Sequence, residues 1–297
     1  MVKTQFGIKD LENLSNVKAH TIRIWEKRYN LLEPERTDTN IRKYSLDSLK
    51  KLLNISYLYH AGHKISSLAT YNQQQIQTLI KENLENNSLD YALNLFKSAM
   101  LEFDGNLFDQ TLEKLLEEKT LRQIFSGIFV PLLTDVGVLW HSGTIDPSHE
   151  HFISEKIKHS IIEHLHKQKT IKNDSSKLFT LYLPLDEIHE IGLLYANYEL
   201  LSAGFSTIYL GPNIPLESLN HVLKTKKENI FITYFTVQPG KDGIAEYFQK
   251  FSEMVCEKNK CELWVLGQKK EKTSNKNIKV FHSLKTFTAH IDSLKTA

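Results

Sequence analysis

The chain has 297 residues, enough for two or three domains, and its 41% apolar and 24% charged residues are typical of a globular protein. The formal net charge is only +2, but residues 1–70 hold twelve Lys and Arg against seven Asp and Glu. The remaining residues hold twenty-five basic side chains against twenty-eight acidic ones. A basic head on a mildly acidic body suits a DNA-binding domain joined to a module with another task.

The composition also argues against a secreted or membrane protein. Cys256 and Cys261 are too few and too close for a disulfide framework or a zinc site, which points to a reducing cytoplasm. The N-terminus lacks the apolar run of a signal peptide. The longest apolar stretch, residues 128–140, is interrupted by a proline, a threonine and an aspartate, so no membrane span is expected.

Residues 1–72 have the pattern of an all-α winged helix-turn-helix head. Short helices are expected at residues 8–14 and 18–29, with a turn between them. Residues 30–42, rich in Glu, Pro, Arg, Thr and Asn, form a wing-like loop. Ser45 then caps a third helix, which runs to about His60.

The rest of the chain divides into three parts. Residues 73–88 are polar and rich in Gln and Asn, and we interpret them as a linker. Residues 89–175 have apolar positions at helical spacing, which predicts a four-helix bundle. Residues 176–297 alternate apolar runs with helical stretches, which predicts a Rossmann-like α/β domain with a parallel five-stranded sheet. The expected strands are residues 177–183, 206–210, 229–236, 262–266 and 278–281.

Side chains suited to DNA contact gather on the second helix and the wing. Arg23 can bind guanine through two hydrogen bonds or clamp a phosphate. Lys43 would contact backbone phosphates and Tyr44 would donate to one, while Ile24 and Trp25 supply packing. The alternative for such a cluster is a solvated basic face. The residues expected to contact double-stranded DNA are Lys18, His20, Thr21, Arg23, Arg28, Tyr29, Arg36, Arg42, Lys43 and Tyr44.

Two short segments of the head carry a family resemblance. T-I-R-I-W-E at residues 21–26 and R-K-Y at residues 42–44 resemble the second helix and the wing of MerR-family transcription regulators. The resemblance implies a homodimer whose recognition helices enter successive major grooves of operator DNA. RNA polymerase is a further partner that such a regulator would meet in the cytoplasm.

Two motifs follow in the body of the chain. W-x9-E-H occupies residues 140–151 in the predicted bundle, and E-x-H-x-x-G occupies residues 187–192 after the first predicted strand. In this order they resemble the cobalamin-binding MerR regulators of the light-responsive CarH type, over nearly the whole chain. Taken singly, each motif has an ordinary structural explanation, such as a loop histidine or a core tryptophan.

The second motif has the chemistry that a corrinoid needs. His189 stands at the carboxyl end of the first strand, where open α/β sheets bind ligands. A neutral imidazole is a good cobalt ligand, so His189 is the expected lower axial ligand. Glu187 could accept the other ring N–H and fix the tautomer. Gly192 would let the nucleotide tail of the cofactor pass close to the next helix.

The resemblance implies further roles. Trp140 would cover the upper face of the corrin ring, with Glu150 and His151 near the upper ligand. His141 stands where the family has a histidine that takes the upper position after photolysis. Adenosylcobalamin or methylcobalamin would bridge bundle and Rossmann-like domain, and would set the oligomeric state, homodimer or homotetramer, and hence operator occupancy. The remaining residues expected to bind the cofactor are Gly211, Thr233 and Gly267.

Two segments depart from the family pattern. The tail-binding S-x-V becomes, most nearly, Thr233-Tyr234-Phe235, one residue out of register, and a late Gly-Gly becomes Gly267-Gln268. A bulky Phe235 and the side chain of Gln268 would crowd the slot for the nucleotide tail.

These departures leave two functions open. The first is a cobalamin-dependent, light-responsive regulator. The second is a MerR-type regulator whose B12-like domain no longer binds cobalamin and serves for dimerisation, partner binding or another ligand. A cobalamin enzyme is excluded, because the sequence supplies no substrate-binding barrel and the DNA-binding head argues against catalysis.

Overall fold

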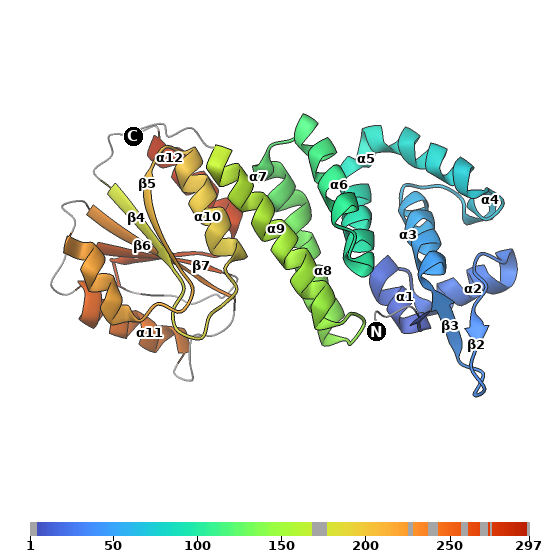
Figure 1. Ribbon diagram of the computed structural model, residues 1–297, viewed down its shortest axis with the longest axis horizontal. Helices are drawn as coiled ribbons and strands as arrows, with labels where there is room; N and C mark the ends of the chain where they lie inside the picture. Colours follow the sequence, from blue (N-terminus) through green and yellow to red (C-terminus); the bar gives the residue numbers. More distant parts are fainter. Residues whose placement is uncertain are drawn as a thin grey trace. The chain divides into compact units, whose positions relative to one another are not determined.

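The computed structural model describes residues 5–167, 177–224, 228–236, 243–256, 261–267, 273 and 275–295, without the side chains of residues 84–88 and 295. The chain divides into two compact units, Met1–Lys156 and Ile157–Ala297. The first unit contains the basic head and the helices that follow it as far as Lys156, and the second contains the end of the last of these helices and the α/β domain (Figure 1).

The head is a winged helix-turn-helix, as predicted, but it is not all-α, because three short strands pair in it. Its helices are α1 (Ile8–Ser15), α2 (Ala19–Tyr29), α3 (Leu46–His60) and the short α4 (Ile65–Leu68). Its strands are β1 (Gln5–Phe6), β2 (Glu35–Arg36) and β3 (Arg42–Ser45). β3 pairs antiparallel with both others, so the wing hairpin is joined to the strand that precedes α1.

Local sequence signals explain where the helices of the head begin and end. Asn16 and Asn30 follow α1 and α2 in the left-handed conformation, with φ of 57° and 49°, which asparagine tolerates better than most residues. Ser45 accepts a hydrogen bond from the backbone N–H of Ser48 and caps α3, as predicted. Gly62 follows the end of this helix with a φ of 98°.

Four helical segments follow, which confirms the predicted bundle. They are α5 (Gln73–Glu102), α6 (Gly105–Glu118), the continuous run of α7 (Leu121–Ile124), η1 (Phe125–Phe129) and α8 (Val130–His141), and α9 (Pro147–Lys167). The rings of Phe96, Phe108 and Phe129 contact one another in the core of the bundle and are fully buried. Buried Lys97 pairs with Asp135 across 2.6 Å and joins α5 to α8.

The predicted linker at residues 73–88 is wrong. These residues form the first half of α5, a helix of 30 residues. Asn72 caps it reciprocally with Gln75, each side chain accepting from the other's backbone N–H. Ile76 and Ile80 are buried, so packing stabilises a stretch whose polar composition resembles that of a linker.

The run Leu121–His141 is long and apolar enough to cross a membrane by length and composition alone, with a mean hydropathy of 1.5. The polar interruptions noted in the sequence therefore do not disqualify it by that measure. Ile128, Leu132, Val136 and Leu139 are buried within the first unit. We interpret the run as the core helix of the bundle.

The second unit has the predicted parallel five-stranded sheet. Its strands are β4 (Lys177–Tyr182), β5 (Ser206–Gly211), β6 (Glu228–Phe235), β7 (Cys261–Gly267) and β8 (Ile278–Phe281), in the order β5-β4-β6-β7-β8. Between and after them lie α10 (Ile191–Ser202), η2 (Leu216–Lys224), α11 (Gly243–Phe251), η3 (Ser252–Cys256) and α12 (Leu284–Lys295).

Each face of this sheet has its own core, because neighbouring residues of a strand point to opposite faces. Phe179 and Trp264 pack with residues of α10 and α12 on one face. Phe231 and Val265 pack with residues of α11 on the other. The chain leaves β4 toward β5 on one side and places β6 on the other, so a topological switch point lies between β4 and β6.

The two cysteines form a disulfide, although no disulfide framework was expected. Cys256 ends η3 and Cys261 begins β7, and both are buried. Their Cα atoms lie 5.6 Å apart, within the range that a disulfide spans.

Candidate DNA-binding and corrinoid-binding sites

The exposed face of α2 is mostly basic. His20, Arg23, Ile24, Lys27 and Arg28 are exposed and recur at i, i+3, i+4, i+7 and i+8, so they share one side of the helix. On the other side Ile22 and Trp25 are buried. Ile24 does not supply packing as predicted, because it is 52% exposed. The face is suited to lie in a DNA groove.

Glu26 connects α2 to the wing. Its two carboxylate oxygens accept from Nε of Arg42 at 3.0 and 3.1 Å. One of them also accepts from the hydroxyl of Tyr44 at 2.9 Å. The pKa of the Tyr44 hydroxyl is raised well above its usual range, first by burial and then by the Glu26 carboxylate.

This network corrects two predicted DNA contacts. Tyr44 is fully buried, so it cannot donate its hydroxyl to a DNA phosphate. Arg42 uses Nε inside the protein, so part of its guanidinium holds the wing rather than DNA. Both predictions failed for the same reason. The sequence does not show that β3 lies beside α2, where Arg42 and Tyr44 meet Glu26.

The other predicted DNA-binding residues are either exposed or half-buried. Nζ of Lys18 lies 3.5 Å from a Glu12 carboxylate oxygen, and Arg36 donates to Asn40 at 2.6 Å. Lys43 lies on β3 and is half-buried. Two contacts lie between neighbouring residues of α2. The hydroxyl of Thr21 is 3.3 Å from Nε2 of His20, and the guanidinium carbon of Arg28 is 5.6 Å from the centre of the Tyr29 ring.

The W-x9-E-H motif joins the end of α8 to the start of α9. Trp140 is 49% exposed, and its ring lies 5.0 Å from that of His141. One turn earlier, a Cβ added to Gly137 would meet no described atom within 4 Å. Glu150 accepts from Ser154 at 2.9 Å. An exposed tryptophan beside an open stretch of helix is suited to contact a ligand.

His151 and the helix cap complete this region. Nε2 of exposed His151 lies 3.7 Å from the Glu150 carboxylate. Asp146 caps α9: the backbone N–H and hydroxyl of Ser148 both donate to Asp146. These bonds lower the pKa of Asp146. The adjacent His149, absent from the predicted site, is buried and stacks on Phe103.

The head contacts the loop between α8 and α9, which lies inside this motif. Asn13 of α1 donates to the hydroxyl of Thr144 at 2.9 Å and to that of Ser142 at 3.3 Å. Lys50 of α3 also pairs with Glu102 at the end of α5, across 2.6 Å. Hydrogen bonds from Asn13 thus connect the DNA-binding head to the loop directly after Trp140 and His141, within the first unit.

In the second unit, Glu187 holds His189 as predicted. Nδ1 of His189 lies 2.6 Å from a Glu187 carboxylate oxygen that also accepts the His189 backbone N–H at 3.0 Å. Because an ionised carboxylate only accepts hydrogen bonds, Nδ1 is placed to donate to it, and in the neutral tautomer with Nδ1–H the lone pair is on Nε2. The imidazole is 52% exposed. It can therefore offer Nε2 to a ligand in solution.

Glu187 also ties this loop to the next strand of the sheet. It is buried, and its second oxygen accepts the backbone N–H of Thr236, just after β6, at 3.1 Å. The pair therefore sits at the switch point between β4 and β6, where open α/β sheets bind ligands. In the described part of the chain, no three His, Cys, Asp or Glu side chains cluster to hold a metal ion.

Gly192 does not face an open slot, contrary to its predicted role. A Cβ added to Gly192 would lie 2.5–2.8 Å from three carbons of the Tyr234 ring. A side chain at residue 192 would collide with the Tyr234 ring unless the ring moved, and Tyr234 packs against the core formed with α10 and α12. Burial, and then the charge of Glu187, raise the pKa of Tyr234.

Of three further predicted cofactor residues, Gly211 and Gly267 have backbone conformations that favour glycine, and the Thr233 hydroxyl is unsatisfied within the described part of the chain. Gly211 has a φ of 81° and its carbonyl accepts from Leu183. Gly267 has a φ of 143°, and a Cβ there would lie 2.5 Å from the carbonyl oxygen of Phe235. The hydroxyl of Thr233 is buried without a hydrogen-bond partner among the described residues, on the sheet face opposite to Tyr234.

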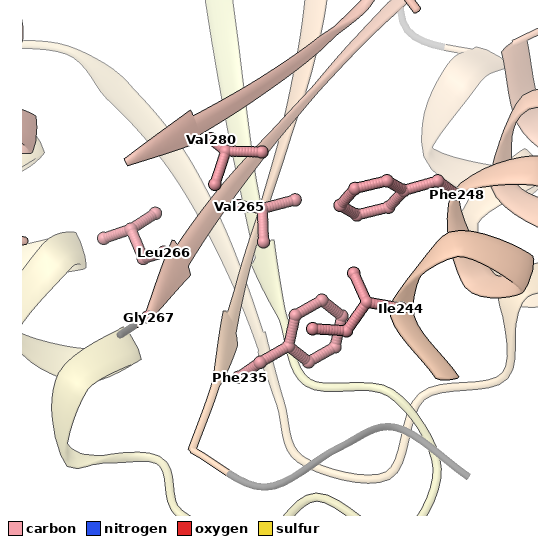
Figure 2. Close-up of a pocket in the computed structure, with 7 residues that line it drawn as sticks. All are labelled: Phe235, Ile244, Phe248, Val265, Leu266, Gly267 and Val280. Carbon is pink, nitrogen blue, oxygen red and sulfur yellow. The ribbon is translucent and has the colours of Figure 1, made fainter. Parts of the chain in front are cut away.

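Phe235 does not crowd the expected slot. It points to the α11 face, packs on Tyr247 and lines the small cavity that Figure 2 shows together with Ile244 and Phe248. The cavity measures about 10 Å³, room for about one water molecule. Gln268 lies outside the described residues.

The site thus fits a corrinoid in part. The Glu187–His189 pair suits an axial cobalt ligand, whereas the place expected for the nucleotide tail is occupied by Tyr234. Sequence reasoning missed Lys27, Glu26 and Tyr234. The helical spacing of Lys27 from His20 and Arg23 could have identified it. Glu26 ends the T-I-R-I-W-E motif, but its bonds to Arg42 and Tyr44, like the packing of Tyr234 on Gly192, join residues that are distant in the sequence.

Comparison with known proteins follows the same division of the chain. Residues 6–75 match the MerR HTH family regulatory protein domain, and residues 92–163, in the bundle, match a B12 binding domain. The chain is 27% identical over 230 residues to the HTH-type transcriptional repressor CarH of Myxococcus xanthus, covering 75% of this chain and 76% of CarH. It is 22% identical over 214 residues to the repressor CarA of the same organism, covering 71% and 70%.

A solved structure shares the fold. The monomethylamine corrinoid protein of Methanosarcina barkeri superposes with a TM-score of 0.55, covering 67% of this chain and 94% of that one. The sequence identity is 11%, so the likeness is one of fold alone.

Proposed function

We propose that this chain, a CarH-like transcription regulator with a MerR-type head and a B12-binding domain, changes its operator occupancy when it binds a cobalamin. The observation that carries the proposal is the Glu187–His189 pair at the switch point of the sheet. A buried carboxylate holds Nδ1, and the half-exposed ring keeps Nε2 for a metal.

The head would bind operator DNA through the exposed face of α2. Arg23 and Lys27 point away from the buried Trp25, so both can reach base edges or phosphates when α2 enters a major groove. Arg36 of the wing would contact the backbone. A homodimer would present two such helices, with RNA polymerase as a further partner and the cytoplasm as the site of action.

The cofactor would be adenosylcobalamin or methylcobalamin, whose cobalt–carbon bond supplies the chemistry that a light-responsive switch needs. Within the first unit, Trp140 and His141, with Glu150 and His151, are the residues we propose for cofactor contact. Asn13 links the head to the residues directly after Trp140–His141. Ligand binding there could shift the head and, with it, the balance between dimer and tetramer.

The test is spectroscopic. The full chain is mixed with adenosylcobalamin or methylcobalamin in the dark, gel-filtered, and its visible spectrum recorded. We expect co-eluting corrinoid with His189 as the lower ligand, and loss of that spectral signature in His189→Ala. His282→Ala, an exposed histidine in the same unit, is the matched control. No corrinoid bound by the wild type would contradict the proposal.

A second function is favoured by a specific observation. The ring of Tyr234 against Gly192 closes the place expected for the nucleotide tail. A regulator without the cofactor would use its second unit for dimerisation or for a partner. DNA affinity and oligomeric state that do not respond to any corrinoid, in the dark or in light, would support it.

A further inference from the structure

The contact between α10 and β6 leaves no gap beside Gly192. Three carbons of the Tyr234 ring would lie within 2.8 Å of a Cβ at this position, so the ring rests directly on bare backbone. Tyr234 is also packed against the core of α10 and α12 and is shielded enough from water for the pKa of its hydroxyl to rise. The space beside Gly192 is therefore already filled by an aromatic ring.

The neighbouring contacts hold this region together. The Tyr209 hydroxyl donates to Glu190, the residue before α10, at 2.9 Å, and Lys158 pairs with the same carboxylate at 2.7 Å. Glu187 fixes the end of β6 through the backbone of Thr236. The cavity of Figure 2 offers no substitute, since it lies on the α11 face and holds about one water.

The metal-binding side of the site is, in contrast, accessible. His189 is half-exposed, with its tautomer set by Glu187, and it needs no opening between α10 and β6. In a complete cobalamin, the benzimidazole of the nucleotide tail can itself occupy the lower cobalt position. A protein imidazole then has to displace that base, and the displaced tail needs a place to lie. A corrinoid without the tail has no such requirement.

We propose that Tyr234 excludes the nucleotide tail, so that the chain selects corrinoids that lack it, the cobinamide class, over complete cobalamins. The inference rests on the proposed function, because it assumes that His189 binds cobalt. It assigns to Tyr234 the role of a specificity-determining residue: its ring occupies the volume that a larger heterocyclic base would need.

The experiment compares two probes on the full chain, aquocobinamide and aquocobalamin, by absorbance titration and calorimetry. We expect the wild type to bind the cobinamide at least tenfold more tightly, equivalent to about 1.4 kcal/mol. Tyr234→Ala should tighten cobalamin binding at least tenfold and leave cobinamide binding within about threefold. Tyr234→Phe keeps the ring and should keep the wild-type preference. Tyr198→Ala, which truncates another half-buried tyrosine of this unit, is the matched control.

The outcomes separate the two proposals. Equal or tighter binding of aquocobalamin by the wild type would overturn the inference and leave the proposed function standing. Binding of neither probe by the wild type or by Tyr234→Ala would overturn both. If circular dichroism shows that Tyr234→Ala is unfolded, Tyr234→Leu replaces it, with a larger side chain in the core and the same expected direction.

Discussion

The hydroxyl of Tyr44 donates to the carboxylate of Glu26 across 2.9 Å, and this bond links the wing to the recognition helix. The same carboxylate accepts from Arg42. A residue of α2 therefore determines where the wing lies, and two side chains that look like DNA contacts are used inside the head. The position of the wing relative to α2 depends on Glu26.

Replacing Glu26 should damage both folding and DNA binding. Glu26→Gln removes the charge that Arg42 and Tyr44 share, and we expect a loss of about 1–3 kcal/mol in the free energy of unfolding. Urea denaturation and anisotropy with operator DNA measure the two effects. Glu33→Gln, on the exposed loop after α2, is the control and should change neither. Unchanged stability in the Glu26 variant would contradict the role we assign to it.

The exposed face of α2 should carry operator recognition. Arg23→Ala should weaken specific binding by about 1–3 kcal/mol with little effect on other sequences. Arg36→Ala should weaken binding to all sequences and reduce the slope of log affinity against log salt by about one. Anisotropy titrations at several salt concentrations distinguish the two. Equal losses on operator and random DNA in Arg23→Ala would show that Arg23 binds only phosphate.

Glu187 should act through His189. Glu187→Gln keeps the size of the side chain but weakens its hold on Nδ1, and we expect a 10–100-fold loss of corrinoid affinity. Glu228→Gln, at the exposed start of β6, is the matched control. Absorbance titration gives the affinities. An unchanged spectrum and affinity in Glu187→Gln would remove the basis for its positioning role.

Alkaline pH should destabilise the chain through its buried tyrosines. Burial and neighbouring groups raise the pKa of Tyr44, Tyr182 and Tyr209 in the folded state. A raised folded pKa gives stability that is complete below about pH 10 and is lost as the pH rises above it, because the unfolded tyrosines ionise first. Thermal unfolding at pH 8 and pH 11 measures the loss. In Tyr44→Phe the decline should be shallower, and an identical decline would contradict this contribution.

Asn13 should couple ligand binding to the head. Asn13→Ala removes the hydrogen bonds to Ser142 and Thr144 and should cost about 0.5–1.5 kcal/mol of stability. It should also reduce the change in operator affinity that a corrinoid produces, with corrinoid affinity little changed. Anisotropy with and without corrinoid is the measurement. A full response in the variant would show that the coupling follows another route.

Features that depend on residues near each other in the sequence were predictable. Ser45 caps α3 through a bond that spans three residues, and Glu187 reaches His189 two residues away. The five strands and the helices between them follow from the periodicity of their apolar residues. The sequence alone thus predicted the helix-turn-helix of the head, the helical segments of the bundle, the parallel sheet and the hydrogen bond between Glu187 and His189.

Contacts between distant elements were decided only by the tertiary structure. Tyr44 became buried because β3 lies beside α2, and residues 73–88 became helical because Ile76 and Ile80 pack in a core. Tyr234 fills the space beside Gly192 because β6 lies against α10. Whether a side chain meets solvent, a ligand or another part of the chain depends on packing between such elements, and local periodicity contains no information about it.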